Sequence, residues 1–317
     1  MAQSTQRKPA GRSPGPSGKP LTKKQRRSQA AARSVSVNAR PAWQSPTVIT
    51  SVSVGIIAVV LIIIVIINQV GGPSSAATAL TPVPKAVLTA VEQPSSTVVD
   101  TVGTGGQSGE MVKLPGNTVL KDSSGKPMIV YVGAEYCPFC AAERWIMVMW
   151  LSRFGTFSNL SEMQSSSTDV YPNTHTFTFY KSKYTSSVID FSPVEVQDRN
   201  QNTLQTPTSQ QESLYTKYDQ PPYTVEAGGF PFLDIANVFS LYNTSFSPQD
   251  LANLSWSQIA AKLSDPSDPV TKDIVGNANI LTAATCIATG DQPASVCSSS
   301  TIQNIEATLN TLKVPTS

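Results

Sequence analysis

The clearest hydrophobic pattern in the chain lies between Lys126 and Gly155, and it predicts a strand followed by a helix. Residues 128–133 are apolar at odd and even positions alike, which is typical of a central strand that is covered on both faces. After a short turn, apolar residues recur at i, i+3 and i+4 from Ala141 to Trp150, a spacing that predicts an amphipathic helix. We expect this helix to end near Gly155.

Further periodic segments continue this α/β alternation. The alternating residues 174–180 predict a strand, and residues 188–196 predict another strand that Pro193 restricts to an edge or a bulged position. The polar residues 197–211 indicate a loop. The pattern then predicts a short helix at 211–218, two strands within 232–242 that meet near Ala236-Asn237, and helices at 256–263, 270–288 and 301–312. A folded domain over residues 111–314 is long enough for one substantial core.

An uncharged stretch before this domain predicts a transmembrane helix over residues 48–70. No charged residue occurs from Ala42 to Pro84. As a helix, residues 48–70 would be about 34 Å long, enough to span a hydrocarbon core of roughly 30 Å. A cleaved signal peptide ending near Ala77-Thr78-Ala79 and a buried soluble helix remain alternatives, although 47 residues are long for a signal n-region.

The charge distribution predicts the orientation of this helix. Residues 1–47 contain ten Lys or Arg and no Asp or Glu, whereas the rest of the chain has a net charge of −8. Basic residues before a membrane span remain cytoplasmic, so residues 71–317 should be extracytoplasmic. The tail has no aromatic residue before Trp43, and we interpret it as a disordered segment near lipid head groups. We do not expect nucleic-acid binding, and we expect residues 71–110 to form a flexible linker.

The run Cys137-Pro138-Phe139-Cys140 stands between the predicted strand and its helix, where it predicts a redox centre. Cys137 would lie at the helix N-terminus, where free N–H groups and the helix dipole stabilise a thiolate. Cys140 would then resolve a mixed disulfide formed by Cys137. Pro138 suits the first helical position because its missing N–H would be unpaired there in any case.

Two other interpretations of these cysteines were considered. A structural zinc site needs four ligands, and Cys286, Cys297 and His175 are the remaining candidates. Ten residues separate Cys286 from Cys297, which is not a zinc-knuckle spacing. An inert structural bond between Cys137 and Cys140 remains open. We expect neither a metal nor a cofactor, and we interpret His175 as a strand residue.

The strand, the Cys137–Cys140 motif, the helix and Pro231 before a further strand together resemble the thioredoxin superfamily. The whole layout is similar to the domain of unknown function 929 family, single-pass prokaryotic proteins with the same anchor. They carry a Glu-Tyr-Cys-Pro-Phe-Cys run like residues 135–140 and a Gly-Phe-Pro-Phe-Leu-Asp run like residues 229–234. The resemblance implies a thioredoxin-like fold with C-terminal helices. The ninety residues between Cys140 and Pro231 imply a strand- and loop-rich insertion.

The resemblance also implies a role for the segment around Pro231. Thioredoxin-type domains carry a cis proline at the start of the corresponding strand, so we expect a cis bond between Phe230 and Pro231. The Phe230 backbone would then lie beside Cys137 and bind an extended substrate strand. The simpler interpretation is a proline that begins a strand.

Cys286 and Cys297 would face an oxidising compartment if the predicted topology holds. A bond between them would close a 12-residue loop and contribute roughly 3 kcal/mol in the chain-entropy model. We therefore expect a structural disulfide, while a second redox pair that exchanges electrons with Cys137 and Cys140 remains an alternative.

Two hypotheses of function follow. The first is a membrane-anchored, extracytoplasmic thiol–disulfide oxidoreductase that acts on the thiols or disulfides of exported proteins and exchanges electrons with a membrane partner. The second is a non-enzymatic binding or scaffold domain at the cell surface. The direction of electron flow depends on the reduction potential of the pair, so oxidation, reduction and isomerisation all remain open.

Overall fold

A mixed five-stranded sheet forms the centre of the protein in the computed structural model, which describes residues 80–108, 110–116 and 118–316. The strand order is β2-β10-β9-β3-β8. Its strands are β2 (Val112–Lys113), β3 (Met128–Gly133), β8 (Asp190–Glu195), β9 (Phe232–Ile235) and β10 (Phe239–Tyr242). β8 runs parallel to β3, and the other neighbours are antiparallel. β8 is an edge strand, as Pro193 predicted.

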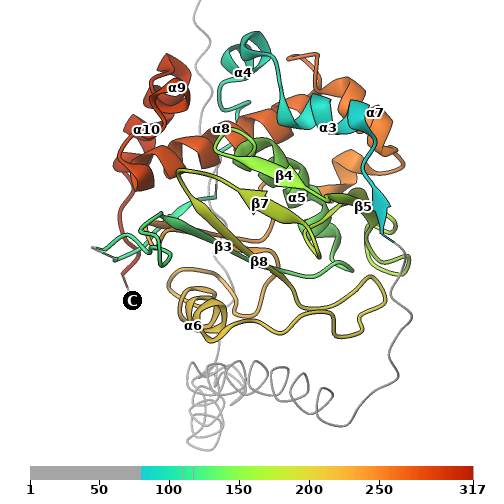
Figure 1. The fold of residues 1–317 in the computed structure, drawn as a ribbon, viewed down its shortest axis with the longest axis horizontal. Coiled ribbons are helices and arrows are strands. Elements are labelled where there is room, and N and C mark those ends of the chain that lie inside the picture. Colours follow the sequence, from blue (N-terminus) through green and yellow to red (C-terminus); the bar gives the residue numbers. More distant parts are fainter. Residues whose placement is uncertain (1–79, 109, 117, 317) are drawn as a thin grey trace, which may run out of the picture. The chain divides into compact units, whose positions relative to one another are not determined.

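Helices cover both faces of this sheet, so the predicted α/β class is confirmed. α5 and α8 lie on one face and α6 lies on the other (Figure 1). The helices are α3 (Lys85–Glu92), α4 (Ser96–Val102), α5 (Pro138–Leu151), α6 (Ser209–Tyr218), α7 (Trp256–Lys262), α8 (Pro269–Thr289), α9 (Ala294–Cys297) and α10 (Ser300–Asn310), with a 3-10 turn η2 (Pro248–Leu251). The predicted helices after residue 137 thus form within a few residues of their expected bounds.

Alternate residues of β3 explain why its sequence is apolar throughout. Ile129 and Tyr131 belong to the large core with α5 and α8, whereas Val130 and Val132 belong to the smaller core with α6. All four side chains are at most 2% exposed. A strand that is buried on both faces does not alternate between apolar and polar residues. The packing on both faces also fixes β3 directly before the Cys137–Cys140 motif.

The segment between α5 and β8 forms four strands of two small sheets, which agrees with the expected strand- and loop-rich insertion, and β1 from the start of the described chain completes one of them. The first has the order β1-β5-β6 and the second pairs β4 with β7. Their strands are β1 (Thr81–Pro82), β4 (Thr156–Ser158), β5 (Ser161–Gln164), β6 (His175–Thr178) and β7 (Lys183–Thr185). Phe177 of β6 packs against Trp145 of α5 with ring centroids 4.5 Å apart, so the insertion is part of the main core.

The prediction of a flexible linker over residues 71–110 is wrong for its described part. α3 and α4 form there, and Val91 is fully buried in the main core, with Val87 and Val98 at 4% and 6% exposure. The sequences of the two helices mix strong helix formers such as Ala and Leu with β-branched Val and Thr. Burial of the valine face, rather than composition, therefore decides the local structure.

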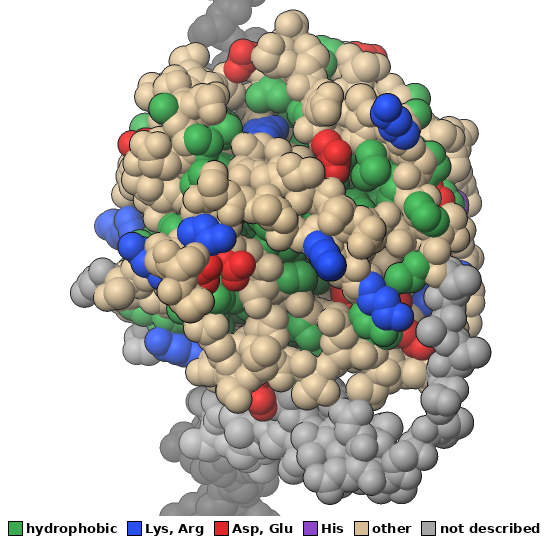
Figure 2. All heavy atoms as spheres, in the orientation of Figure 1, with side chains coloured by type: hydrophobic (Ala, Val, Ile, Leu, Met, Phe, Trp, Pro, Cys, Tyr) green, Lys and Arg blue, Asp and Glu red, His purple; other side chains and the backbone are tan. Residues whose placement is uncertain are grey.

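The predicted tail (1–47), the predicted transmembrane helix (48–70) and the start of the predicted linker lie outside the described residues. Within the described ranges, no helix combines the length and apolar composition that crossing a membrane requires. On the face in Figure 2, charged side chains of both signs are scattered among uncharged ones, rather than gathered in one patch of a single sign.

Candidate redox site

Cys137 is the N-cap residue of α5, directly after the turn that follows β3. Its extended backbone (φ −73°, ψ 122°) lets the side chain turn back over the first helical turn. The Cys137 Sγ accepts a hydrogen bond from the Cys140 N–H at 3.3 Å. Pro138 occupies the first helical position, as expected. The sequence therefore places a sulfur where free N–H groups and the helix dipole favour negative charge.

Cys140 lies deeper than Cys137 and is the second thiol of the site. Both cysteines are free thiols in the structure, with Cys137 6% exposed and Cys140 0% exposed. A hydrogen bond with the Cys140 thiol lowers the pKa of Cys137, and the Cys140 and Phe139 amides and the Arg144 charge assist. Burial raises the pKa of Cys140 well above its ordinary value, and its bond to Cys137 raises it further. The two thiols therefore differ: the outer sulfur, Cys137, favours the thiolate form, and the inner sulfur, Cys140, favours the protonated form.

A buried ion pair lies behind the two thiols. Arg144 of α5 donates to both oxygens of Glu195 of β8, through Nε at 2.9 Å and Nη2 at 2.7 Å, and neither side chain is exposed. Arg144 Nη2 also donates to the carbonyl of Ala134 at 2.9 Å. This network joins the helix, the edge strand and the turn before the motif. A guanidinium bound at both oxygens offsets the cost of burying Glu195.

Glu135 is a second carboxyl of this region and precedes Cys137 by two residues in the chain. It accepts a hydrogen bond from Thr178 Oγ1 at 2.5 Å. Burial and the nearby charge of Glu195 raise the pKa of Glu135 to about 7. A half-buried carboxyl with this pKa is able to exchange protons near neutral pH.

Phe230 and Pro231 lie beside Cys137, as the resemblance implied. The Phe230–Pro231 bond is cis, and Pro231 directly precedes β9. The Cys137 thiol donates a hydrogen bond to the carbonyl oxygen of Phe230, with 3.8 Å between sulfur and oxygen. Four of the predicted site residues, namely Cys137, Cys140, Phe230 and Pro231, therefore come together in one place.

Aromatic side chains surround the outer thiol. Tyr136 and Phe139 are both half-buried. Phe139 meets Tyr171 of the insertion edge to face, with centroids 5.9 Å apart, and the Tyr136 carbonyl accepts from the Ser166 N–H at 2.9 Å. The rim of the site is consequently apolar, and the 159–174 part of the insertion supports one side of it.

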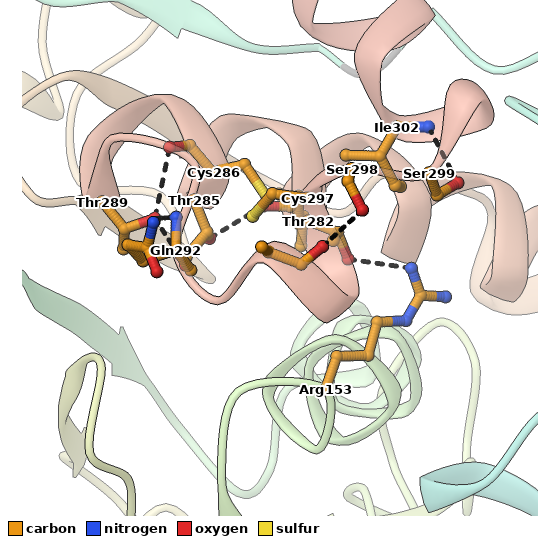
Figure 3. The surroundings of a disulfide bond; sticks show 12 residues. Arg153, Thr282, Thr285, Cys286, Thr289, Gln292, Cys297, Ser298, Ser299 and Ile302 are labelled. Carbon is orange, nitrogen blue, oxygen red and sulfur yellow. Dashed lines mark hydrogen bonds between the residues drawn. A yellow bond between two sulfur atoms is a disulfide. The ribbon is translucent and has the colours of Figure 1, made fainter.

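Cys286 and Cys297 form a disulfide bond elsewhere in the protein (Figure 3). Their side chains are 0% and 1% exposed. Trp150, near the end of α5, donates to Thr285 Oγ1 at 2.9 Å, so this bond adjoins the end of α5 opposite Cys137. A helix rise of 1.5 Å per residue makes that separation roughly 20 Å. Burial and distance therefore favour a structural role over direct exchange with Cys137 or Cys140.

Several charged side chains around the candidate site were not predicted from the sequence. Arg144 and Glu195 lie 51 residues apart, and Asp219 lies in the segment that follows α6. The charged residues Glu143 and Arg144 inside an apolar helix were a usable signal for buried polar contacts. Nothing in the sequence identifies the partner of Arg144, because strand β8 and helix α5 meet only in the folded protein.

Together these features define an α/β protein with a Cys-x-x-Cys pair at the N-terminus of a buried helix. The chain belongs to the family described as Domain of unknown function (DUF929), whose model matches residues 117–287. That match contains Cys137, Cys140 and Pro231 and confirms the resemblance to the domain of unknown function 929 family. No curated protein and no solved structure matches the chain.

Proposed function

We propose that this protein is a membrane-anchored thiol–disulfide oxidoreductase that acts on exported proteins through Cys137 and Cys140. The observation that carries the proposal is the placement of Cys137 Sγ. It lies between the Cys140 N–H at 3.3 Å and the Phe230 carbonyl at 3.8 Å, at the start of a buried helix. Such a sulfur has both a means of thiolate stabilisation and a neighbouring backbone edge for a substrate.

In the reductive direction, the Cys137 thiolate attacks one sulfur of a substrate disulfide. A Cys137–substrate bond forms, the substrate bond breaks, and the second substrate sulfur leaves as a thiolate that takes a proton from water. Cys140 then loses its proton and attacks Cys137 Sγ, which releases the first substrate sulfur. The substrate gains two electrons and two protons, and the protein gains a Cys137–Cys140 disulfide. Oxidation of a substrate dithiol is the same sequence reversed.

The proton that Cys140 must lose suggests a task for Glu135, because both groups interact with the Arg144–Glu195 pair. Because burial raises the pKa of Cys140, the thiol needs an acceptor for the resolving step. Glu135, with its pKa near 7, is half-exposed and interacts with the charge of Glu195. We assign Glu135 the task of passing this proton to solvent.

The arrangement of the main sheet supports a thioredoxin-like frame for this chemistry. β3 leads into the motif and α5, β8 lies parallel to β3, and the antiparallel pair β9 and β10 follows Pro231. The uncharged residues 48–70 and the basic residues before them support an extracytoplasmic position of the domain. In that position the substrates are exported protein thiols or disulfides, and a membrane protein supplies or accepts the electrons.

A trapping experiment tests this proposal in the full-length protein. In Cys140→Ala the resolving thiol is absent, so mixed disulfides at Cys137 should accumulate with a peptide that contains one disulfide. In Cys137→Ser they should fall to less than about one hundredth of that amount, because the attacking thiolate is lost. Mass spectrometry of the Cys137 peptide measures both. Absence of any adduct in Cys140→Ala would favour the alternative of a non-enzymatic binding or scaffold domain.

A further inference from the structure

The end of helix α6 binds the backbone segment that precedes Pro231. Asp219 is the C-cap residue of α6 and is 1% exposed. Its Oδ2 accepts hydrogen bonds from the N–H groups of Gly228 and Gly229, each at 2.8 Å. One carboxylate oxygen therefore fixes two consecutive peptide units immediately before Phe230, whose carbonyl borders Cys137.

Tyr215, one turn earlier on α6, holds the same segment from a second direction. Its hydroxyl donates to the Gly229 carbonyl at 3.4 Å. Its ring stacks on Phe230 with centroids 5.7 Å apart and an interplanar angle of 21°. Gly228 has a φ of +87°, a region that favours glycine, so the segment needs external contacts to adopt one conformation.

Helix α6 is itself fixed to the sheet, which makes it a rigid support. Gln211 Nε2 donates to the Ser192 carbonyl of β8 at 3.2 Å. Tyr218 donates to Asn237 Oδ1 at 2.7 Å, in the turn between β9 and β10. Through α6, Asp219 and Tyr215 are therefore held in place by the same sheet that positions Cys137.

A carboxylate is a costly choice for this position. Among the described residues, Asp219 takes part in no ion pair, and a buried charge without a cation is unfavourable. Charge-assisted hydrogen bonds are about twice as strong as neutral ones. The cost is consistent with a segment that must be held more firmly than packing alone would achieve.

We propose that Asp219 is a positioning residue for substrate binding. It fixes the Gly228–Pro231 backbone beside Cys137 in the conformation that receives an extended substrate segment, and Tyr215 completes this support. The inference rests on the proposed oxidoreductase function and deepens it. It also assigns a purpose to α6, an element of the long insertion between the motif and Pro231.

The test compares Asp219→Asn with the matched control Glu212→Gln in the full-length protein. Glu212 is exposed on the first turn of the same helix, so both variants remove one negative charge from α6. The probe is a peptide with one disulfide. Asp219→Asn should raise the KM for this peptide about tenfold, because a neutral acceptor holds the two amides less firmly. Glu212→Gln should leave the KM unchanged.

Two further measurements separate positioning from a general loss of structure. Alkylation of Cys137 by iodoacetamide, a small reagent that needs no substrate edge, should change less than about twofold in Asp219→Asn. Hydrogen–deuterium exchange in the peptide that contains residues 220–231 should become faster in Asp219→Asn and not in Glu212→Gln. An unchanged KM, or a loss of Cys137 alkylation parallel to the KM effect, would overturn the proposal.

The exchange measurement also separates this inference from the proposed function. If the wild-type protein reacts with no disulfide, the proposed function fails and the substrate role of Asp219 fails with it. If the wild type is active while exchange of residues 220–231 is equal in Asp219→Asn and wild type, Asp219 does not hold the segment. In that case the positioning role alone is overturned.

Discussion

At the scale of single residues, the protein buries more carboxyl groups than it pairs with cations. Glu143 on α5 is 0% exposed, and it accepts a hydrogen bond from the Ser245 N–H at 2.9 Å. Burial raises the pKa of Glu143 to about 7. Asp234 of β9 is also 0% exposed, and burial likewise raises its pKa to about 7. Such groups hold protons in the folded protein that they would release on unfolding near neutral pH.

These raised pKa values predict how stability depends on pH. A carboxyl whose folded pKa exceeds its unfolded pKa stabilises the fold fully below about pH 4.5. This contribution is lost as the pH rises through about 7. The free energy of unfolding of the wild type should therefore fall between pH 5 and pH 8, by roughly 2–3 kcal/mol from Glu143 alone at about 1.4 kcal/mol per pKa unit.

Urea unfolding of Glu143→Gln at the two pH values provides the check. Glutamine retains an acceptor for the Ser245 N–H but does not titrate, so this variant should lose part of the pH dependence. A wild-type stability that rises from pH 5 to pH 8 would contradict the prediction, as would an identical slope in Glu143→Gln.

At the scale of elements, the Cys286–Cys297 bond ties the end of α8 to α9 (Figure 3). The replacement of both cysteines by serine should lower the free energy of unfolding by about 3 kcal/mol, because the unfolded chain gains the freedom of the opened loop. Alkylation of Cys137 should stay within about twofold of the wild type, since the two sites are distant. Chemical unfolding and alkylation kinetics measure the two effects. A large change in Cys137 reactivity with little change in stability would instead indicate a second redox pair.

The elements also show which parts of the fold were predictable from the sequence. The sequence predicted β3 and α5 well because buried residues set their apolar patterns. It predicted β9 and β10 well because a turn at Ala236-Asn237, where both residues have positive φ, separates two apolar runs. α3 and α4 were missed because Gly, Pro, Ser and Thr around them favoured a linker, and because β-branched Val and Thr offset the helix preference of Ala, Leu, Lys and Glu. Their helices depend on contacts with α7 and α8, which lie more than 150 residues further along the chain.

For the candidate site, the motif residues were predictable from the sequence, and the residues that support them were not. Local motifs indicated Cys137, Cys140 and Pro231, because a cysteine pair at a helix start and a proline at a strand start are visible in sequence. Arg144 and Glu195 are 51 residues apart in the chain, whereas Asp219 and Gly228 are nine residues apart but are joined through an irregular loop. No periodicity specifies such contacts, so the support of the site emerges only from the fold.

At the scale of the whole molecule, one frame serves both parts of the proposed chemistry. The main sheet carries the motif at the end of β3 and the proposed substrate edge at the start of β9, and these strands are direct neighbours. α5 behind them is buried along its length, with Trp145 and Trp150 both 0% exposed. A rigid frame of this kind maintains the distance between Cys137 and Phe230 while a substrate binds and leaves.

The central claim is that Cys137 is an activated thiolate whose partner is Cys140. The most direct test is the rate of Cys137 alkylation as a function of pH in the reduced full-length protein, with mass spectrometry to identify the modified residue. The midpoint for Cys137 should lie below the value of about 8.5 for a free cysteine. It should move upward in Cys140→Ala, which removes the thiol hydrogen bond. A midpoint at or above that of free cysteine, or faster modification of Cys140 than of Cys137, would contradict the account.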